Sequence, residues 1–161
     1  MKALLAVIGS FLVAALLCVL PLPLALQWFR PDCLLLVLLY WSLAFPERHG
    51  VLSAVAVGLL QDVLTGSLLG KHPLAYCIAV SVMLIGYKRM RMFEPWQQAV
   101  LVLLLLLLCQ LVEWWVDTVT GIQTDGFWFL LPALTGALAW PPLLSLLRDI
   151  RRKAGLVNRI A

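Results

Sequence analysis

Charged residues are scarce in this chain, and their scarcity limits what it can be. They make up 12% of the 161 residues, against roughly 25% in an average soluble domain, whereas 63% are hydrophobic. No stretch is polar enough and long enough to form a soluble domain, so catalysis on a large soluble substrate is not expected. The composition predicts an all-α membrane protein in which residues 1–161 form a single polytopic transmembrane domain.

The chain also lacks the patterns of metal and disulfide sites. Its cysteines are isolated in or beside apolar runs, at Cys18, Cys33, Cys77 and Cys109. Without a CxxC motif or a Cys/His cluster, they behave as small hydrophobic residues and indicate neither a zinc site nor a disulfide framework. His72 has no acidic or metal-ligating partner at ligand spacing, which predicts a solvated loop residue.

Catalytic motifs are missing as well. The glycine spacing of GSLLGKH at 66–72 does not match a phosphate loop, and no strand precedes it. No His/Glu metal pair lies on one helix, and neither a Ser/His arrangement nor a central pair of acids is present. We therefore predict no catalytic residues, no cofactor and no metal, and a protein that is not an enzyme. The net charge of +4 does not indicate nucleic-acid binding, because the basic residues fall in membrane loops.

What the chain does have is long apolar runs. A helix needs about 20 apolar residues to cross a bilayer. Six spans are predicted, at about 3–20, 32–46, 50–67, 73–87, 97–119 and 127–147, followed by a basic cytoplasmic tail at 148–161. The first run imitates a secretory signal but is longer than a usual signal core and has no small-x-small cleavage site, so we expect it to remain uncleaved.

The distribution of basic residues predicts the orientation. With six spans, both termini lie on one side of the membrane. That side receives ten of the twelve Lys and Arg residues, and the other receives Arg30 and Lys71. Because cytoplasmic loops carry the excess of basic residues, both termini are predicted to be cytoplasmic.

The third span has the clearest pattern in the sequence. Gly50, Ala54, Gly58, Asp62 and Gly66 recur every four residues and form one ridge of the helix. Small residues let another helix approach closely, so this ridge predicts a contact within the fold or with a partner. Asp62 lies about 18 Å along the axis from Gly50, in the outer half of the bilayer. An acid at that depth is either a functional group or a structural hydrogen-bond acceptor, and the sequence leaves both open.

Two other polar positions have alternative interpretations. Arg30-Pro31-Asp32 is a helix start, with an outer-surface contact for a partner as the alternative. Glu113 and Asp117 share one face at the outer end of the fifth span. They are solvated acids at a helix end or a site for a basic partner.

These motifs together resemble a known family. FRPD at 29–32, LLVLLYWSLAFPERHG at 35–50, GLLQDVLTGSLLG at 58–70 and WQQA at 96–99 are similar to MreD, the rod shape-determining membrane protein of bacteria. The positions that carry the resemblance, as a partner-binding or structural signature, are Arg30, Pro31, Asp32, Tyr40, Trp41, Pro46, Arg48, Gly50, Gly58, Asp62, Gly66 and Gly70.

The resemblance implies a role rather than a chemistry. It implies a non-enzymatic, multi-pass component of the bacterial inner membrane in the cell elongation (Rod) complex. Such a protein binds MreC, and through it MreB, RodA and the partner transpeptidase of RodA, and so helps organise lateral-wall peptidoglycan synthesis. Membrane lipids and a second copy of the chain are further expected partners. The implied fold is similar to the substrate-binding subunits of energy-coupling-factor transporters. The alternative function is therefore a small-molecule or lipid-binding subunit of a transporter, with Asp62 lining an outward-facing pocket.

Overall fold

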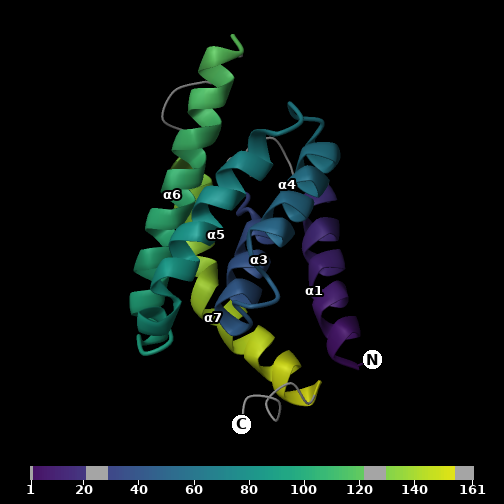
Figure 1. The fold of residues 1–161 in the computed structure, drawn as a ribbon, viewed down its shortest axis with the longest axis vertical. Helices are drawn as coiled ribbons and strands as arrows, with labels where there is room; N and C mark the ends of the chain where they lie inside the picture. The colour runs from purple at the N-terminus through teal and green to yellow at the C-terminus, as the bar shows by residue number, and fades with distance from the viewer. Residues whose placement is uncertain (1, 21–28, 122–129, 155–161) are drawn as a thin grey trace.

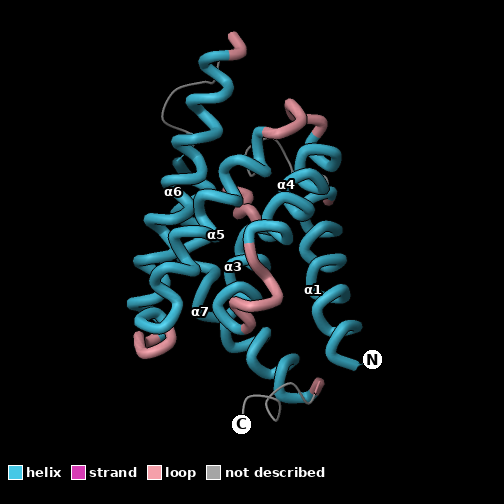
Figure 2. Tube along the Cα trace, in the orientation of Figure 1, coloured by secondary structure: helices cyan, strands magenta, loops and turns pink. Residues whose placement is uncertain are grey.

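The computed structural model describes residues 2–20, 29–121 and 130–154, and within these ranges the regular elements are helices (Figures 1 and 2). This confirms the all-α class. The helices are α1 (Lys2–Val19), α3 (Cys33–Ala44), α4 (Val51–Thr65), α5 (Lys71–Met90), α6 (Pro95–Val119) and α7 (Leu131–Lys153).

Local capping signals set several helix ends. The Asp32 side chain accepts a hydrogen bond from the Leu35 N–H at 3.1 Å and caps the start of α3. Helix α4 ends at Gly66, whose φ of 64° is left-handed and suits glycine. At the start of α6, Glu94 and Gln97 form a capping box around Pro95.

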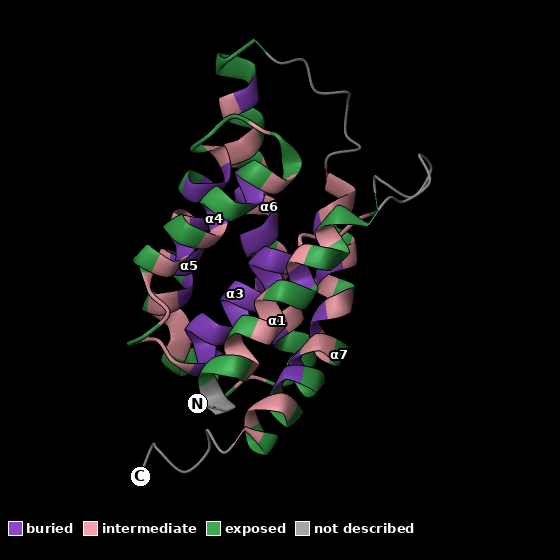
Figure 3. Cartoon of the chain, turned by 90° about the vertical axis from the view of Figure 1, so that its right-hand side faces the viewer, coloured by how far each residue is buried: buried purple, intermediate pink, exposed green. Residues whose placement is uncertain are grey.

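Helix α3 is the core of the bundle. All of its residues from Leu34 to Ala44 are buried, and α1, α4, α5 and α7 pack around it (Figure 3). A helix that is apolar on every side is stable only when it is covered on every side. The pairs α4–α5 and α6–α7 complete the assembly, so the motif-rich segment of the sequence contains the centre of the fold.

The outer faces of the bundle are apolar. Helix α6 is long and apolar enough to cross a membrane, whereas α1, α3 and α4 are shorter apolar helices. Large hydrophobic residues are exposed along the outward faces, including Leu12, Leu52, Leu104 and Leu138. Exposed apolar surface of this extent is typical of a protein surrounded by lipid.

Helix α1 begins and α7 ends at the same end of the bundle (Figure 1). The turns at 45–50 and 91–94 lie at this end too, which we call the terminal end. The turn at 66–70 lies at the opposite end, which we call the distal end. The start of α1 and the end of α7 therefore lie at one end of the bundle, which is compatible with the predicted topology.

The helix bounds differ in places from the predicted ranges. Helix α5 extends at both ends beyond 73–87, because Gly70 rather than Pro73 starts it. Helix α7 continues through Lys153, so the first residues of the predicted tail belong to a long helix. Residues 127–129 of the predicted sixth span and residues 155–161 of the predicted tail lie outside the described residues.

Candidate functional site

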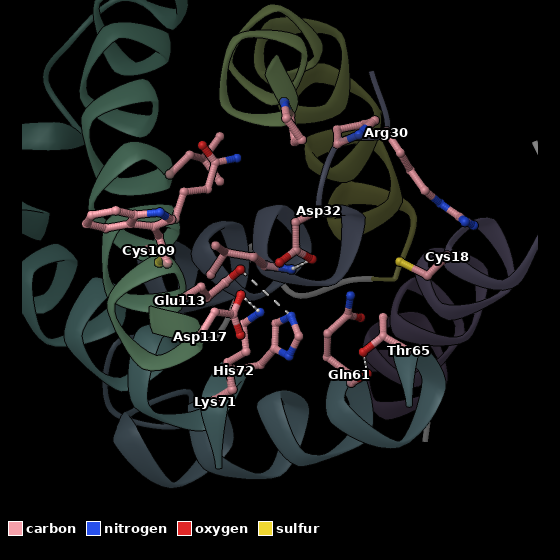
Figure 4. Close-up of a pocket in the computed structure, with 16 residues that line it drawn as sticks. Cys18, Arg30, Asp32, Gln61, Thr65, Lys71, His72, Cys109, Glu113 and Asp117 are labelled. Carbon is pink, nitrogen blue, oxygen red and sulfur yellow. Dashed lines mark hydrogen bonds and ion pairs between the residues drawn. The ribbon is translucent and has the colours of Figure 1, made fainter. Parts of the chain in front are cut away.

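A polar cavity of about 310 Å³ lies in the distal half of the bundle (Figure 4). Its walls come from the start of α3, the last turns of α4, the first turn of α5 and the distal half of α6. Its polar lining residues are Arg30, Asp32, Gln61, Thr65, Lys71, His72, Gln110, Glu113, Trp114 and Asp117. Polar groups are otherwise rare along these helices, so the cavity is the candidate site.

Asp62 lies behind one wall of the cavity and is not part of its lining. The side chain is buried and accepts hydrogen bonds from the N–H groups of Gly70 at 2.6 Å and His72 at 3.2 Å. It also accepts from the Ser67 hydroxyl at 3.0 Å, and it lies 2.6 Å from His72 Nδ1. The carboxylate therefore holds the 66–70 turn and the start of α5 in place. The alternative function had Asp62 lining a pocket, but Asp62 does not line this cavity, because its oxygens accept hydrogen bonds from its own turn.

Two glycines make this turn possible. Gly66 and Gly70 have φ values of 64° and 104°, which residues with a Cβ rarely adopt. The turn they form brings the Gly70 and His72 N–H groups onto the Asp62 carboxylate. Both glycines are thus structural members of the signature.

His72 is buried, in contrast to the prediction of a solvated loop residue. Its Nδ1 bonds Asp62, which leaves Nε2 directed toward the cavity, 4.0 Å from the Glu113 carboxylate. The prediction failed because the acidic partner lies ten residues away across a turn, beyond helical spacing. A lone acid and a lone histidine flanking a glycine-rich turn would have been the signal.

Two pairs of residues close the other walls of the cavity. Lys71 Nζ lies 2.7 Å from Asp117 Oδ2 and joins α5 to α6. Tyr76, fully buried, donates its hydroxyl hydrogen bond to Asp32 and joins α5 to α3. Asp117 is buried and therefore not the solvated acid expected at a helix end, and its basic partner lies within the chain, which argues against the alternative of a basic partner protein.

Several lining groups have no partner in the protein. The amide oxygens of Gln61 and Gln110 are buried without a hydrogen bond among the described residues. Glu113 has His72 at 4.0 Å as its ion-pair neighbour and makes no hydrogen bond within the same ranges. Leaving a buried polar group unsatisfied costs about 1–3 kcal/mol, so such groups point to a ligand. The described residues contain no group of three or more His, Cys, Asp and Glu that could hold a metal ion.

The middle of the ridge of small residues lies inside the fold, whereas Gly50 and Gly66 at its two ends are not buried. Ala54 and Gly58 are buried, and a Cβ on Gly58 would come within 2.5 Å of the Pro73 nitrogen. Helix α4 therefore uses this ridge to approach the first turn of α5. Of the two alternatives left open by the sequence, the geometry matches the contact within the chain.

The signature residues fall into two groups at opposite ends of the bundle. Arg30, Pro31, Asp32, Asp62, Gly66 and Gly70 surround or support the polar cavity, whereas Tyr40, Trp41, Pro46, Arg48 and Gly50 lie at the terminal end. The twelfth residue, Gly58, packs against the first turn of α5 between these groups. The half-buried Arg30 donates a hydrogen bond to the Leu17 carbonyl at the end of α1. The structure thus does not bring the signature together into one site.

At the terminal end the signature serves packing. Trp41 is fully buried, donates from Nε1 to the Ser10 hydroxyl at 2.9 Å, and stacks on Phe45. Arg48 is exposed in the turn between α3 and α4. Burial and then the charge of Arg48 lower the pKa of His49 in the same turn.

Two residues outside the signature also hold this end. Arg91 donates to the carbonyls of Leu43 and Ala44, at distances between 2.8 and 2.9 Å, and so covers the end of α3. Gln98, fully buried, donates to the Met90 and Phe93 carbonyls and closes the turn between α5 and α6. The WQQA motif, which contains Gln98, was visible in the sequence, but these contacts were not.

Comparison with known proteins identifies the family of the chain. The family model described as rod shape-determining protein MreD matches residues 2–150. The rod shape-determining protein MreD of Haemophilus influenzae is 31% identical over 150 residues, which cover 93% of each chain. No solved structure gives a significant match. The apolar helical bundle and the match over nearly its whole length show that the chain belongs to the MreD family of rod shape-determining membrane proteins.

Proposed function

We propose that the protein is a non-enzymatic component of the Rod complex in the bacterial inner membrane, where it binds MreC. Through MreC it is linked to MreB, RodA and the partner transpeptidase, and it helps organise lateral-wall peptidoglycan synthesis. Membership of a family with a role in cell shape supports the biological process. The feature that supports a helix-binding role is an apolar groove on the side of the bundle.

The apolar groove lies between α1 and α7, with α3 as its floor, and has a volume of about 610 Å³. It runs from Leu5 to Leu17 of α1, about 18 Å along the helix axis at 1.5 Å per residue. On the α1 side it is lined by small residues, Ala6, Gly9, Ser10 and Ala14. Small residues allow the close approach that holds membrane helices together, since lipid tails provide no hydrophobic gain.

The transmembrane helix of MreC is the proposed occupant. A single-span helix packs against its neighbours at an axial distance of about 8–10 Å, with side chains entering grooves between helices. The α1–α7 groove offers such a surface along the membrane normal. The small-residue ridge of α4 does not, because it is buried against α5.

A glycine substitution tests the groove without disturbing the fold. Gly9 lines the groove, and a Cβ built there meets nothing within 4 Å. Gly9→Leu should fill the groove and lower MreC recovery at least tenfold when the tagged protein is purified in mild detergent. Gly86→Leu on α5 is the matched control, because its Cβ also meets open space and it lies outside the groove.

The outcomes separate the parts of the proposal. Absence of MreC from the unsubstituted preparation would refute the binding. Equal recovery with both variants would refute the groove as the binding surface. Cells that carry Gly9→Leu as their sole copy should round up, whereas Gly86→Leu cells should remain rods. Recovery of ATP-binding-cassette ATPases with a coupling subunit, in place of MreC, would favour the transporter function.

A further inference from the structure

We propose that the polar cavity binds the ammonium group of an amine ligand. The cavity lies in the distal half of the bundle, and Gln61, Gln110 and Glu113, which carry the proposal, do not line the apolar groove proposed for MreC. The proposal rests on hydrogen-bonding groups without partners, on the balance of charge around the cavity, and on its size.

The groups without partners are mainly acceptors. Gln61 is 7% exposed and extends into the cavity, and its side chain makes no hydrogen bond within the described ranges (Figure 4). The amide oxygen of Gln110 on α6 is also buried and has no hydrogen bond within the described ranges. The Glu113 carboxylate points into the same space. A ligand that carries several N–H donors would satisfy acceptors from two helices at once.

The charges that line the cavity are not balanced within the chain. Three carboxylates, those of Asp32, Glu113 and Asp117, line the cavity against two basic side chains, Lys71, which pairs with Asp117, and Arg30, which donates to the uncharged Leu17 carbonyl. Glu113 and Asp32 remain, with no lysine or arginine paired to either among the described residues. Carboxylates in a weakly polar surrounding favour a cation, and Trp114, which also lines the cavity, adds an aromatic ring of the kind that attracts cations.

The geometry points to an organic cation rather than a metal ion. Within the described residues no cluster of acidic, histidine and cysteine side chains has the arrangement of a metal site. The volume of about 310 Å³ is much larger than a bare ion and suits a small organic group. An ammonium group offers three donors and one positive charge, which matches two amide oxygens and a carboxylate.

Two sources could present this group. The cavity adjoins the apolar groove, because Pro31 lines both. An amine headgroup such as that of phosphatidylethanolamine could therefore reach the cavity from the bilayer, and a free diamine such as cadaverine could reach it from solution. Both share the same recognising chemistry, and the test distinguishes them.

The test measures the thermal unfolding of the purified full-length chain. One arm adds cadaverine to protein in detergent, with 1,5-pentanediol as its neutral counterpart. The other arm compares phosphatidylcholine nanodiscs with and without phosphatidylethanolamine, because the choline group has no N–H donors. Saturable stabilisation in either arm, absent with its counterpart, supports the proposal and identifies the source. No stabilisation in either arm overturns it.

Substitutions locate the site. Glu113→Gln and Gln61→Leu remove an acceptor without removing a hydrogen bond of the described structure. Either variant, when folded, should need at least tenfold more of the effective amine for half-maximal stabilisation. Glu47→Gln is the matched control, because Glu47 is exposed in the turn at the terminal end. A wild-type response in both cavity variants would overturn the assignment. Glu113→Gln should retain MreC, so failure of this test leaves the proposed function standing.

Discussion

At the scale of single residues, the buried acid Asp62 is matched by partners close in the sequence. Asp62 takes its hydrogen bonds from Ser67, Gly70 and His72, all within ten residues. The sequence was sufficient to single out Asp62 as a costly acid in an apolar helix. It could not decide between function and structure, because that depends on the path of a turn whose two glycines have positive φ.

Asp62→Asn should destabilise the protein by about 2–3 kcal/mol, because hydrogen bonds to a charged acceptor are lost and an amide nitrogen is turned toward donors. The measurement is the free energy of unfolding in detergent, from a denaturant titration. Asp149→Asn on the exposed face of α7 is the control and should change the stability little. Equal stability of the two variants would show that the Asp62 carboxylate does not hold the turn.

At the scale of helices, the sequence predicts where each helix lies better than it predicts which helices pack against one another. Apolar runs interrupted by proline and glycine were enough to place helices near all six observed positions. The small residues that recur every four positions in α4 identified a packing face. Periodicity does not identify the helix that packs against this face. The structure shows that the first turn of α5 covers Gly58, where an added Cβ would lie 2.5 Å from the Pro73 nitrogen.

Gly58→Ala should weaken the α4–α5 contact by about 1–3 kcal/mol, the usual cost of overpacking. The added Cβ would meet the Pro73 nitrogen and Cα at 2.5 and 2.6 Å, and these are backbone atoms that cannot rotate away. The comparison is Gly86→Ala, where the Cβ meets open space and the helix gains a better helix former. Thermal unfolding midpoints in detergent report both effects. A Gly58→Ala midpoint at or above that of Gly86→Ala would contradict this packing.

At the scale of the whole molecule, the bundle has two chemically different ends. The terminal end contains the start of α1, the end of α7 and two turns with arginine residues, whereas the distal end contains the polar cavity. The apolar composition alone predicted a membrane protein, and the motifs between Phe29 and Gly70 predicted its family. The cavity could not be predicted, since its lining comes from residues between Cys18 and Pro132 that converge only in three dimensions.

The predicted orientation can be tested with reporter fusions. A green fluorescent protein fused after Ala161 should fluoresce, and alkaline phosphatase at the same point should be inactive, because the C-terminus is expected to be cytoplasmic. Alkaline phosphatase fused after Thr120, where α6 has ended at the distal end, should be active. The reverse pattern of activity would show that the polar cavity faces the cytoplasm.

The hydrogen bonds of Asp62 have a consequence for biogenesis. Each of them is made within the segment from α4 to the first residues of α5. An unpaired acid costs about 2.5–3.5 kcal/mol at the centre of a membrane helix. This helical hairpin carries the hydrogen-bond donors for its own acid, so α6 and α7 are not needed to satisfy the Asp62 carboxylate while the chain is being inserted.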